Sequence, residues 1–297
     1  MLDSQRTQFR TGQLSGIFEI QSMPQEMEVL VFAGGEETGT YRLWPDSRLK
    51  ITPGEIGNSW DKLEVPIRAV ALPDQASRAI WQALEFQLFS NKRITGLAEW
   101  RGFLESCRSE RLTGVVEIAS ENCDGFIFLH EGFPTPNESI FCSPEGFTTN
   151  LQIAEGYLDG DLQLTINKAD PATQAYQCTF LRLGVVSWGN RILSNYQDMV
   201  GQKLLHFLSV KLNALLIHRQ SNIHLAGTEI IDNHFFCETR TAAEAYRNLF
   251  HDMSQLIGRV IGGMVTRRIM SSTFDKLGSS QRESLETYTL TPATFMN

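Results

Sequence analysis

The sequence has few of the patterns that would indicate a membrane span or a disulfide framework. Its five cysteines are odd in number and include no CxxC pair. Unpaired thiols of this kind are typical of a chain in a reducing compartment. No uncharged apolar run approaches the ~20 residues that a membrane-spanning helix needs, and the first residues lack the apolar core of a signal peptide. We therefore expect a cytoplasmic protein without a transmembrane segment.

Signatures of catalysis, phosphate binding and metal binding are missing as well. The chain has no GxSxG elbow, and no cysteine lies in a recognisable active-site signature. The glycine-rich segment 34–39 carries two acids and no P-loop lysine, which favours a hairpin turn. His234 and Cys237 form one close pair, whereas a structural zinc site usually has two. We expect no enzyme activity, no cofactor and no metal site, although the many carboxylates leave an acid–base pair open.

Positive charge is absent from one long stretch. Residues 115–167 contain nine acidic residues and no Lys or Arg, whereas residues 168–297 contain 13 basic and 10 acidic residues. An anionic surface repels phosphate backbones, so we expect no nucleic-acid binding here. The stretch is either a solvated face that maintains solubility, or a docking surface for a basic partner or for the chain's own C-terminal region. The candidate residues of this acidic surface are Glu131, Glu138, Glu145, Asp159 and Asp161.

A short motif occurs twice. Residues 14–20, LSGIFEI, recur at 112–118 as LTGVVEI, and each copy is followed by a second apolar run that ends in glycine, at Gly35 and at Gly132. Repetition of a β-rich unit predicts two similar modules, which more often form a platform than a catalytic pocket. The glycine inside each motif is predicted to permit close approach of a neighbouring element, and the later glycine to end a hairpin strand.

Hydrophobic periodicity predicts strands first and helices last. The predicted strands lie near 14–20, 28–33, 39–44, 48–52, 65–71, 112–119, 125–130, 150–154, 161–166 and 177–188, with an extended piece at 223–231. The predicted helices lie at 74–88, 97–107 and 196–217, and from a capping box at 241–244 onward. Residues 91–96 are expected to be a connector, and 134–147 a long loop or a bent edge. The expected fold class is α+β: two related β-rich modules with short helices, followed by a helical C-terminal region. The expected domains are 1–95, 96–194 and 195–278, with a flexible tail at 279–297.

The second module resembles a known family. A predicted helix at 98–107 is followed by RLTGVVEI at 111–118 and by GFIFLHEG at 125–132. This order of a short helix and two glycine-bounded strands resembles the PATAN domain, named for the N-terminal region of the PatA regulators. Residues 97–166 match it best, and residues 10–44 resemble a weaker copy. The resemblance implies a non-catalytic adaptor module of bacterial signalling, and a stand-alone one, because no receiver domain is recognisable.

The last predicted helix is the second candidate interaction surface. Gly258 and Gly262 lie four residues apart, on one face of the expected helix. Glycine in a helix interior costs about 1 kcal/mol relative to alanine, and small residues at this spacing let two helices approach closely. The neighbour stays open between the chain's own helix at 196–217, a second copy and another protein. The candidate residues are Leu256, Gly258, Arg259, Gly262, Met264, Arg267 and Arg268.

Together these features predict a cytoplasmic signalling or assembly adaptor that works through protein–protein interaction. Self-association through the C-terminal helix stays open. The alternative is a ligand-binding sensor with a pocket between the two modules. The predicted lining of that pocket is Phe126, Phe128, Phe133 and Trp188.

Overall fold

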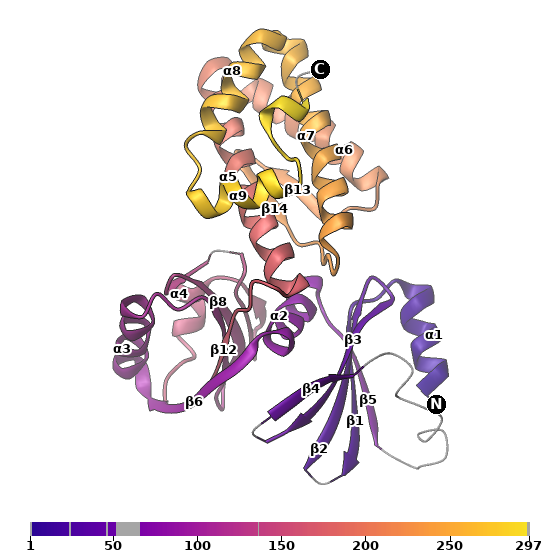
Figure 1. The fold of residues 1–297 in the computed structure, drawn as a ribbon, viewed down its shortest axis with the longest axis vertical. Helices are drawn as coiled ribbons and strands as arrows, with labels where there is room; N and C mark the ends of the chain where they lie inside the picture. The colour runs from indigo at the N-terminus through magenta and orange to yellow at the C-terminus, as the bar shows by residue number, and fades with distance from the viewer. Residues whose placement is uncertain (1, 24, 46, 52–65, 136, 296–297) are drawn as a thin grey trace. The chain divides into compact units, whose positions relative to one another are not determined.

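The computed structural model describes residues 2–23, 25–45, 47–51, 66–135 and 137–295. Some predicted segments extend to residues 52, 65, 136 and 296–297, which lie outside this range. The chain divides into two compact units, Met1–Ala175 and Tyr176–Asn297. The first contains two antiparallel sheets with short helices, and the second is mainly helical, which confirms the α+β class (Figure 1). The predicted boundary at 194 is wrong, because the helical unit begins near Tyr176.

The first sheet has the strand order β4-β3-β2-β1-β5. Its elements are α1 Leu2–Gly12, β1 Gly16–Met23, β2 Glu26–Ala33, β3 Glu36–Trp44, β4 Ser47–Ile51 and β5 Ile67–Ala71. The strands lie where the alternation predicts them. The Phe9 ring of α1 lies 4.7 Å from the Phe18 ring and 5.4 Å from the Phe32 ring, measured between centroids. These buried rings form the core between α1 and the sheet.

The second sheet has the order β11-β10-β8-β7-β12-β6, and β9 pairs with β8. Its strands are β6 Gln87–Thr95, β7 Gly114–Ala119, β8 Asp124–His130, β9 Phe133–Pro134, β10 Ile140–Ser143, β11 Gly146–Thr148 and β12 Asp161–Lys168. Helices α3, Gly96–Ser109, and α4, Leu151–Glu155, belong to the same module. Trp100, Phe103 and Leu104 of α3 are buried in the core of this module, as their shared helix face predicts.

One helix joins the two sheets. Helix α2, Asp74–Glu85, contacts β1 and β2 of the first sheet and β7, β8 and β10 of the second. Its buried residues include Ala76, Ala79 and Ala83, whose small side chains allow close contact with strands on both sides. The helix ends at Glu85, three residues before the predicted end, and β6 begins almost at once.

Two predictions for the second module are wrong, and a third is resolved. The expected connector 91–96 lies mostly within β6, which pairs with β12 along its length. The expected strand 150–154 forms most of α4, because the Asn150 side chain accepts hydrogen bonds from the backbone N–H groups of Gln152 and Ile153, at 2.9 and 3.4 Å. Of the two alternatives for 134–147, the bent edge is present, since β10 and β11 lie at the edge of the sheet.

The two sheets share one topology, which confirms the prediction of two related modules. Each begins with a helix, α1 or α3, and continues with four strands that pair in chain order: β1 to β4, or β7, β8, β10 and β11. A later strand, β5 or β12, pairs with the other side of the first strand. A helix then follows, α2 in the first copy and α5, Gln174–Val200, in the second.

The repeated motif forms the same hydrogen bonds in both copies. They join the end of the helix, the start of the first strand, the hairpin turn and the residue after the last strand. In the first copy the backbone N–H of Leu14 donates to the carbonyl of Phe9 (3.0 Å), that of Gly35 to the carbonyl of Leu14 (2.8 Å), and that of Leu72 to the carbonyl of Ser15 (2.9 Å). In the second copy the N–H of Leu112 donates to the carbonyl of Cys107 (2.9 Å), that of Gly132 to the carbonyl of Leu112 (2.6 Å), and that of Ala169 to the carbonyl of Thr113 (3.0 Å). The hydroxyls of Ser15 and Thr113 each accept from a turn N–H, of Gly34 and Glu131, at 3.0 Å.

The repeat glycines have the predicted structural roles. A Cβ at Gly16 would lie 2.1 Å from the carbonyl oxygen of Val70, and a Cβ at Gly114 would lie 2.1 Å from that of Asn167. The missing side chain therefore lets β5 or β12 approach the first strand of its own sheet. The turn glycines of the two copies have positive φ, 89° and 83°, a conformation that glycine adopts without steric cost.

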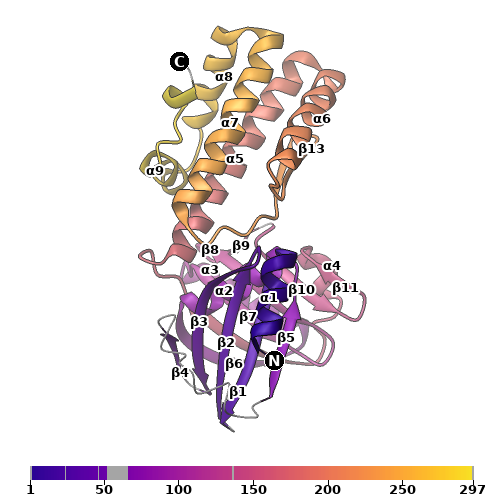
Figure 2. The same ribbon diagram turned by 90° about the vertical axis from the view of Figure 1, so that its right-hand side faces the viewer.

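The second unit comprises α5 and the elements after it. These are α6 Gln202–His218, β13 Ile223–Ala226, β14 Glu229–Asp232, α7 Thr239–Ile261, α8 Gly263–Phe274, α9 Ser279–Thr287 and the 3-10 helix η2 Pro292–Phe295. Helices α5 and α7 run side by side, and the ring centroids of Trp188 and Phe250 are 4.3 Å apart at their contact (Figure 2). The extended piece predicted at 223–231 is the hairpin of β13 and β14.

Several predictions for this unit are wrong. The expected strand 177–188 is part of helix α5, whose residues Leu181, Val185 and Trp188 are buried on one face. Helix α7 begins at Thr239 without a side-chain cap, and it ends before Gly262, whose φ of 85° breaks the helix. The expected flexible tail contains α9 and η2, and its Leu285 and Leu290 are fully buried, because they pack on the core of the unit.

The cysteines and the helices agree with two simpler expectations. All five cysteines are unpaired. Within the part of the chain that the structure describes, no helix combines the length and the apolar composition of a membrane span.

Candidate functional sites

A groove of about 600 Å³ lies in the first unit, between the β3–β4 hairpin and the second sheet. Apolar side chains of its wall include Leu43, Trp44 and Leu84. Its polar floor is formed by strands β6, β7 and β12, through Asn91, Arg93, Glu117, Gln163 and Thr165. On β12 these residues alternate with core leucines, because successive side chains of a strand point to opposite faces. The volume and the polar floor suit a small polar ligand.

A chain of partly buried polar contacts connects the two sheets beside the groove. Arg48 of β4 donates to the side-chain oxygen of Asn167 at 2.6 Å and also to the backbone carbonyl of Phe86. The Asn167 amide in turn donates to Glu117 at 2.5 Å. Burial raises the pKa of Glu117, and the hydrogen bond from Asn167 and the charge of Arg48 oppose this rise. Burial also disfavours the charged form of Arg48, so it lowers the pKa of this guanidinium. These groups satisfy one another, so their first role is to hold the two modules together.

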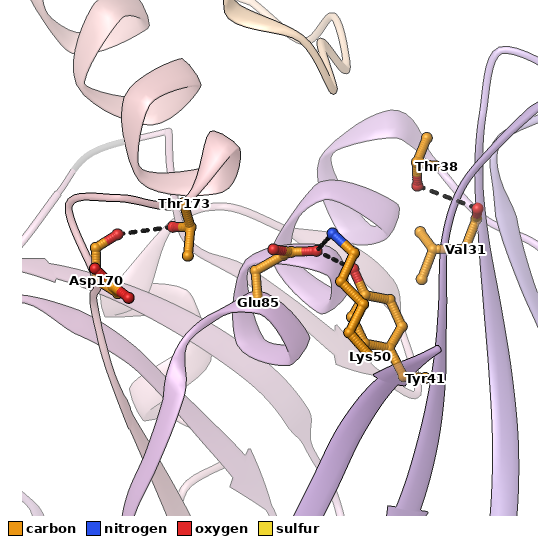
Figure 3. Close-up of polar contacts among 7 residues, drawn as sticks. All are labelled: Val31, Thr38, Tyr41, Lys50, Glu85, Asp170 and Thr173. Carbon is orange, nitrogen blue, oxygen red and sulfur yellow. Dashed lines mark hydrogen bonds and ion pairs between the residues drawn. The ribbon is translucent and has the colours of Figure 1, made fainter. Parts of the chain in front are cut away.

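A second polar contact links the end of α2 to the first sheet. Glu85 accepts hydrogen bonds from the Tyr41 hydroxyl and from the Lys50 ammonium, the latter at 2.5 Å (Figure 3). Burial, with the negative charge of Glu85, raises the pKa of Tyr41, which keeps the phenol neutral. The close-up also shows the bonds from Thr38 to the Val31 carbonyl and from Thr173 to Asp170, at 3.1 and 2.8 Å. Each of these four contacts stabilises the position of a strand, a helix end or a turn.

The aromatic residues predicted to line a pocket between the modules do not line the groove. Phe128 is fully buried and packs against Phe86, with 6.3 Å between ring centroids. Phe126 packs on the small core beside α2, Phe133 is exposed on β9, and Trp188 lies in the core of the second unit. These four aromatic residues lie on different strands and helices, which direct their side chains to different places. Their shared residue type therefore does not predict a shared pocket.

The predicted acidic surface is only partly an open acidic face. Glu138 is buried, and its carboxylate lies 3.6 Å from the guanidinium of Arg78, which is also buried. Glu131 pairs with Arg111 and Asp161 with Arg93, each at 2.6 Å. Glu145 and Asp159 are exposed. The arginines that neutralise this region come from outside the acidic stretch, which is why composition alone missed them.

The residues predicted on the C-terminal helix are divided between two helices. Gly258 is in α7, and a Cβ there would lie 3.7 Å from the Thr266 hydroxyl of α8. The glycine pair therefore does not form one helix face, and the close neighbour is α8 of the same unit. Leu256 is partly buried against the core, whereas Met264 is 84% exposed. Arg259, Arg267 and Arg268 are all exposed, and the first two line a pocket of about 310 Å³ between α7 and α8.

Helix α6 has two apolar faces. Its buried face consists of Leu205, Leu208, Leu212 and Leu216. The second face is a stripe of exposed residues that we call the α6 stripe: Phe207, Val210, Ala214 and Ile217. The expected helix at 196–217 is divided between α5 and α6, which are separated at Gly201. The 3-4-3 spacing of the exposed residues was already visible in the sequence.

Within the described part of the chain, His234, the histidine of the predicted close pair, has no second histidine beside it that would complete a metal site. His234 accepts a hydrogen bond from the backbone N–H of Asn222 at 3.3 Å and packs against Phe236. His224 and His251 are exposed on other elements. Among the residues that the structure describes, no three His, Cys, Asp or Glu side chains are grouped as a metal site would require.

Comparison of the chain with protein-family models, with curated proteins and with solved structures gave no match.

Proposed function

We propose that this chain is a non-catalytic cytoplasmic adaptor, for signalling or assembly, that binds an acidic amphipathic helix of a partner protein on the α6 stripe. The observation that carries the proposal is the exposure of three large apolar side chains on one helix face: Phe207 is 54%, Val210 52% and Ile217 74% exposed. Single exposed apolar residues are common, but a continuous stripe marks an interaction surface.

The spacing of the stripe favours a helical partner. Residues 207, 210, 214 and 217 follow the three-and-four pattern by which the seam of one helix packs against another. Full burial of a Phe or Ile side chain contributes about 1.5–3 kcal/mol, so the part of each side chain that is still exposed can supply useful binding energy.

The charges beside the stripe favour an acidic partner. Residues 202–218 include Lys203 and Lys211 and contain no Asp or Glu. The Arg219 that follows already pairs with Asp252 of α7, at 2.6 Å. The Lys211 ammonium lies 5.5 Å from the centre of the Phe207 ring, at the edge of the stripe. Pairing of α6 with α6 of a second copy would bring these cations together, whereas glutamates beside the seam of a partner helix would form complementary pairs.

The duplicated modules and the PATAN resemblance support the same class of function. In both modules the repeated motif provides backbone hydrogen bonds and close strand contacts, which are properties of a platform. The resemblance of residues 97–166 to the PATAN domain favours an adaptor of bacterial signalling.

A pair of designed peptides tests the proposal. One is an amphipathic helix with Leu at the seam and Glu beside it, and the other has Lys in place of each Glu. The acidic peptide should bind the purified full chain in a fluorescence-anisotropy titration, and the basic peptide should not. The double substitution Phe207→Glu, Ile217→Glu should weaken binding at least tenfold, since each residue contributes more than about 1.4 kcal/mol when buried.

Met264→Glu is the matched control, because Met264 is equally apolar and more exposed but lies on α8. Equal binding of both peptides, or equal loss in the control, would contradict the proposal. Binding to anionic vesicles in place of the acidic peptide would assign the stripe to a membrane surface.

The groove supports a second candidate, a sensor for a small polar ligand. In a thermal-shift screen with nucleotides and metabolites, a ligand at 100 times its Kd should stabilise the folded chain by about 2.7 kcal/mol. Gln163→Ala should remove the shift, because Gln163 lies on the floor and is exposed. If no compound shifts the midpoint, or if the shift persists in Gln163→Ala, the sensor role of this groove is refuted.

A further inference from the structure

The floor of the groove beside the β3–β4 hairpin contains a row of polar side chains that crosses three strands. Thr165 of β12 lies opposite Asn91 of β6 on one side and opposite Glu117 of β7 on the other. All three residues line the groove, and Gln163 lies two residues along β12, on the same face of the sheet. Neighbouring strands are about 4.8 Å apart, so the row presents hydrogen-bonding groups over about 10 Å. This arrangement suits a ligand whose polar groups are distributed along its length.

The neutral groups of the floor are available to such a ligand. Among the described residues, the side chains of Asn91, Gln163 and Thr165 form no hydrogen bond. An amide side chain carries two N–H donors and a carbonyl acceptor, and a hydroxyl both donates and accepts. The hydroxyl groups of a sugar also donate and accept, so they can pair with each of these side chains.

Glu117 adds a stronger acceptor to the floor. One of its carboxylate oxygens accepts a hydrogen bond from the Asn167 amide at 2.5 Å, and within the described part of the chain the other oxygen accepts none. An ionised carboxylate has about four acceptor sites, and its hydrogen bonds are stronger than those between neutral groups. A ligand that is rich in O–H donors can use the remaining sites.

The cations around the groove already have contacts. Arg48 donates to a side-chain oxygen and to a backbone carbonyl, and Arg93 pairs with Asp161 at 2.6 Å. The Lys92 ammonium lies 5.5 Å from the centre of the Phe103 ring. An anionic ligand would therefore have to compete for these cations, and a cationic ligand would be repelled by all three. The charges favour a neutral ligand.

An apolar wall lies beside the polar floor. It includes Leu43, Leu84 and the half-buried Trp44, whose indole offers a large flat surface. A sugar ring carries its hydroxyl groups around the edge and C–H groups on its faces. A site that combines a flat apolar side chain with several amide and hydroxyl groups matches both parts of such a ring.

We propose that this groove binds a neutral disaccharide. Asn91, Gln163 and Thr165 form hydrogen bonds with its hydroxyl groups, Glu117 accepts from one of them, and Trp44 packs against a C–H face. The groove volume of about 600 Å³ lies in the range of pockets for ligands of this size. The inference rests on the sensor role of the groove and gives it a ligand class. It is independent of the α6 stripe, which belongs to the other unit.

Isothermal titration of the full chain with maltose, cellobiose, lactose and sucrose tests the ligand class. At least one of these sugars should bind with a Kd on the order of 1 mM, since the contacts are a few hydrogen bonds between largely neutral groups. AMP and spermidine serve as an anionic and a cationic probe, and both should bind more weakly than that sugar.

Asn91→Ala and Gln163→Ala should each weaken binding of the sugar about fivefold, since each removes hydrogen bonds to it. Both residues are exposed, so circular dichroism and the melting temperature should show an intact fold. Gln87→Ala is the matched control, because Gln87 is an exposed amide residue of the same strand β6 that does not line the groove. It should bind the sugar as the wild type does.

The carbohydrate assignment is overturned if no disaccharide binds at about ten times the expected Kd, or if Gln87→Ala loses as much affinity as Gln163→Ala. Tighter binding of AMP or spermidine than of every sugar would also overturn it. If AMP, spermidine or another metabolite then binds with an affinity that depends on Gln163, the sensor role stands and only the ligand class is wrong. If no compound of the wider thermal-shift screen binds either, the sensor role fails as well.

Discussion

The close approach of strands at Gly114 makes a quantitative prediction about Gly114→Ala. The new Cβ would lie 2.1 Å from the carbonyl oxygen of Asn167 and 3.1 Å from its carbonyl carbon. Both are backbone atoms of β12, so no side chain can rotate away to relieve the contact. The strands would have to separate by about 1 Å, at the pair of residues where Gly114 faces Lys168.

The cost follows from strain and from weakened hydrogen bonds. An added methyl in a well-packed site costs about 1–3 kcal/mol, and each weakened hydrogen bond adds up to about 1 kcal/mol. We expect a loss of about 3 kcal/mol. In a unit of this size, each kcal/mol lowers the midpoint by about 2–4 °C, so the transition of the first unit should fall by about 6–12 °C. Gly16→Ala should lose a similar amount, because its Cβ would make the same 2.1 Å contact with Val70.

Differential scanning calorimetry is the suitable measurement, because the two units can unfold in separate transitions. Gly102→Ala is the matched control: Gly102 is exposed in α3, and a Cβ there has no atom within 4 Å. This change should stabilise the same module by about 0.5–1 kcal/mol. An unchanged or raised midpoint for Gly114→Ala would refute the close contact and, with it, the structural reading of the repeat.

Three further predictions concern buried groups. Arg78→Met should destabilise the first unit by about 3–5 kcal/mol in urea unfolding, because it leaves the Glu138 carboxylate buried without the Arg78 guanidinium. The double variant Arg78→Met, Glu138→Leu should lose less stability, because it buries no charge. An effect below about 1 kcal/mol for Arg78→Met would mean that the pair is solvated. Burial raises the pKa of Glu117 above its usual 4.5, so its contribution to stability is present below that pH and is lost as the pH rises through the folded pKa. Glu117→Gln should therefore become more stable relative to the wild type as the pH is raised from about 4 to about 8, and a constant difference in thermal melts would contradict this. The exposed Cys142 should react fast with an alkylating reagent at neutral pH, whereas Cys178, whose pKa burial raises to about 12, should stay unmodified by mass spectrometry unless the unit unfolds.

The duplication could be predicted because the repeated residues serve the backbone. Each motif glycine allows a neighbouring strand to approach, and each motif hydroxyl, on Ser15 or Thr113, accepts a bond from the hairpin turn. Such requirements restrict the residue type at one position, so they leave a local signal that a single sequence carries. The strand alternation of the first module is local in the same sense.

The sequence pattern predicts a strand in the first half of α5 because this helix is apolar over much of its length. Segment 178–188 is rich in β-branched and large apolar residues, and a short apolar run does not distinguish a buried strand from a buried helix. The distinguishing signal lies in a longer window. Leu181, Val185, Trp188 and Ile192 recur at intervals of four, three and four, and all four are buried in the core. The helical period therefore becomes clear only when residues beyond 188 are included.

The acidic surface could not be predicted, because charge pairing connects distant parts of the chain. Glu138 meets Arg78, 60 positions earlier, and Asp161 meets Arg93 across the β6–β12 pair. A run without basic residues therefore does not define a uniformly anionic face. The polar floor of the groove could not be predicted for the same reason, because Glu117, Asn91 and Gln163 become neighbours only when three strands of one sheet are aligned.

Most of the residues that could bind a partner or a ligand lie outside the repeated motif. Residues that the two copies of the motif share are occupied by backbone hydrogen bonds and by tight strand contacts, so the shared motif offers little free side-chain chemistry. The features that require another explanation lie mainly outside the motif. They are the exposed α6 stripe and the polar groove floor, to which β6 contributes, a strand without counterpart among the described residues of the first module. Substitutions in the motif should therefore change stability first, whereas substitutions at the α6 stripe or on the groove floor should change binding while stability is maintained.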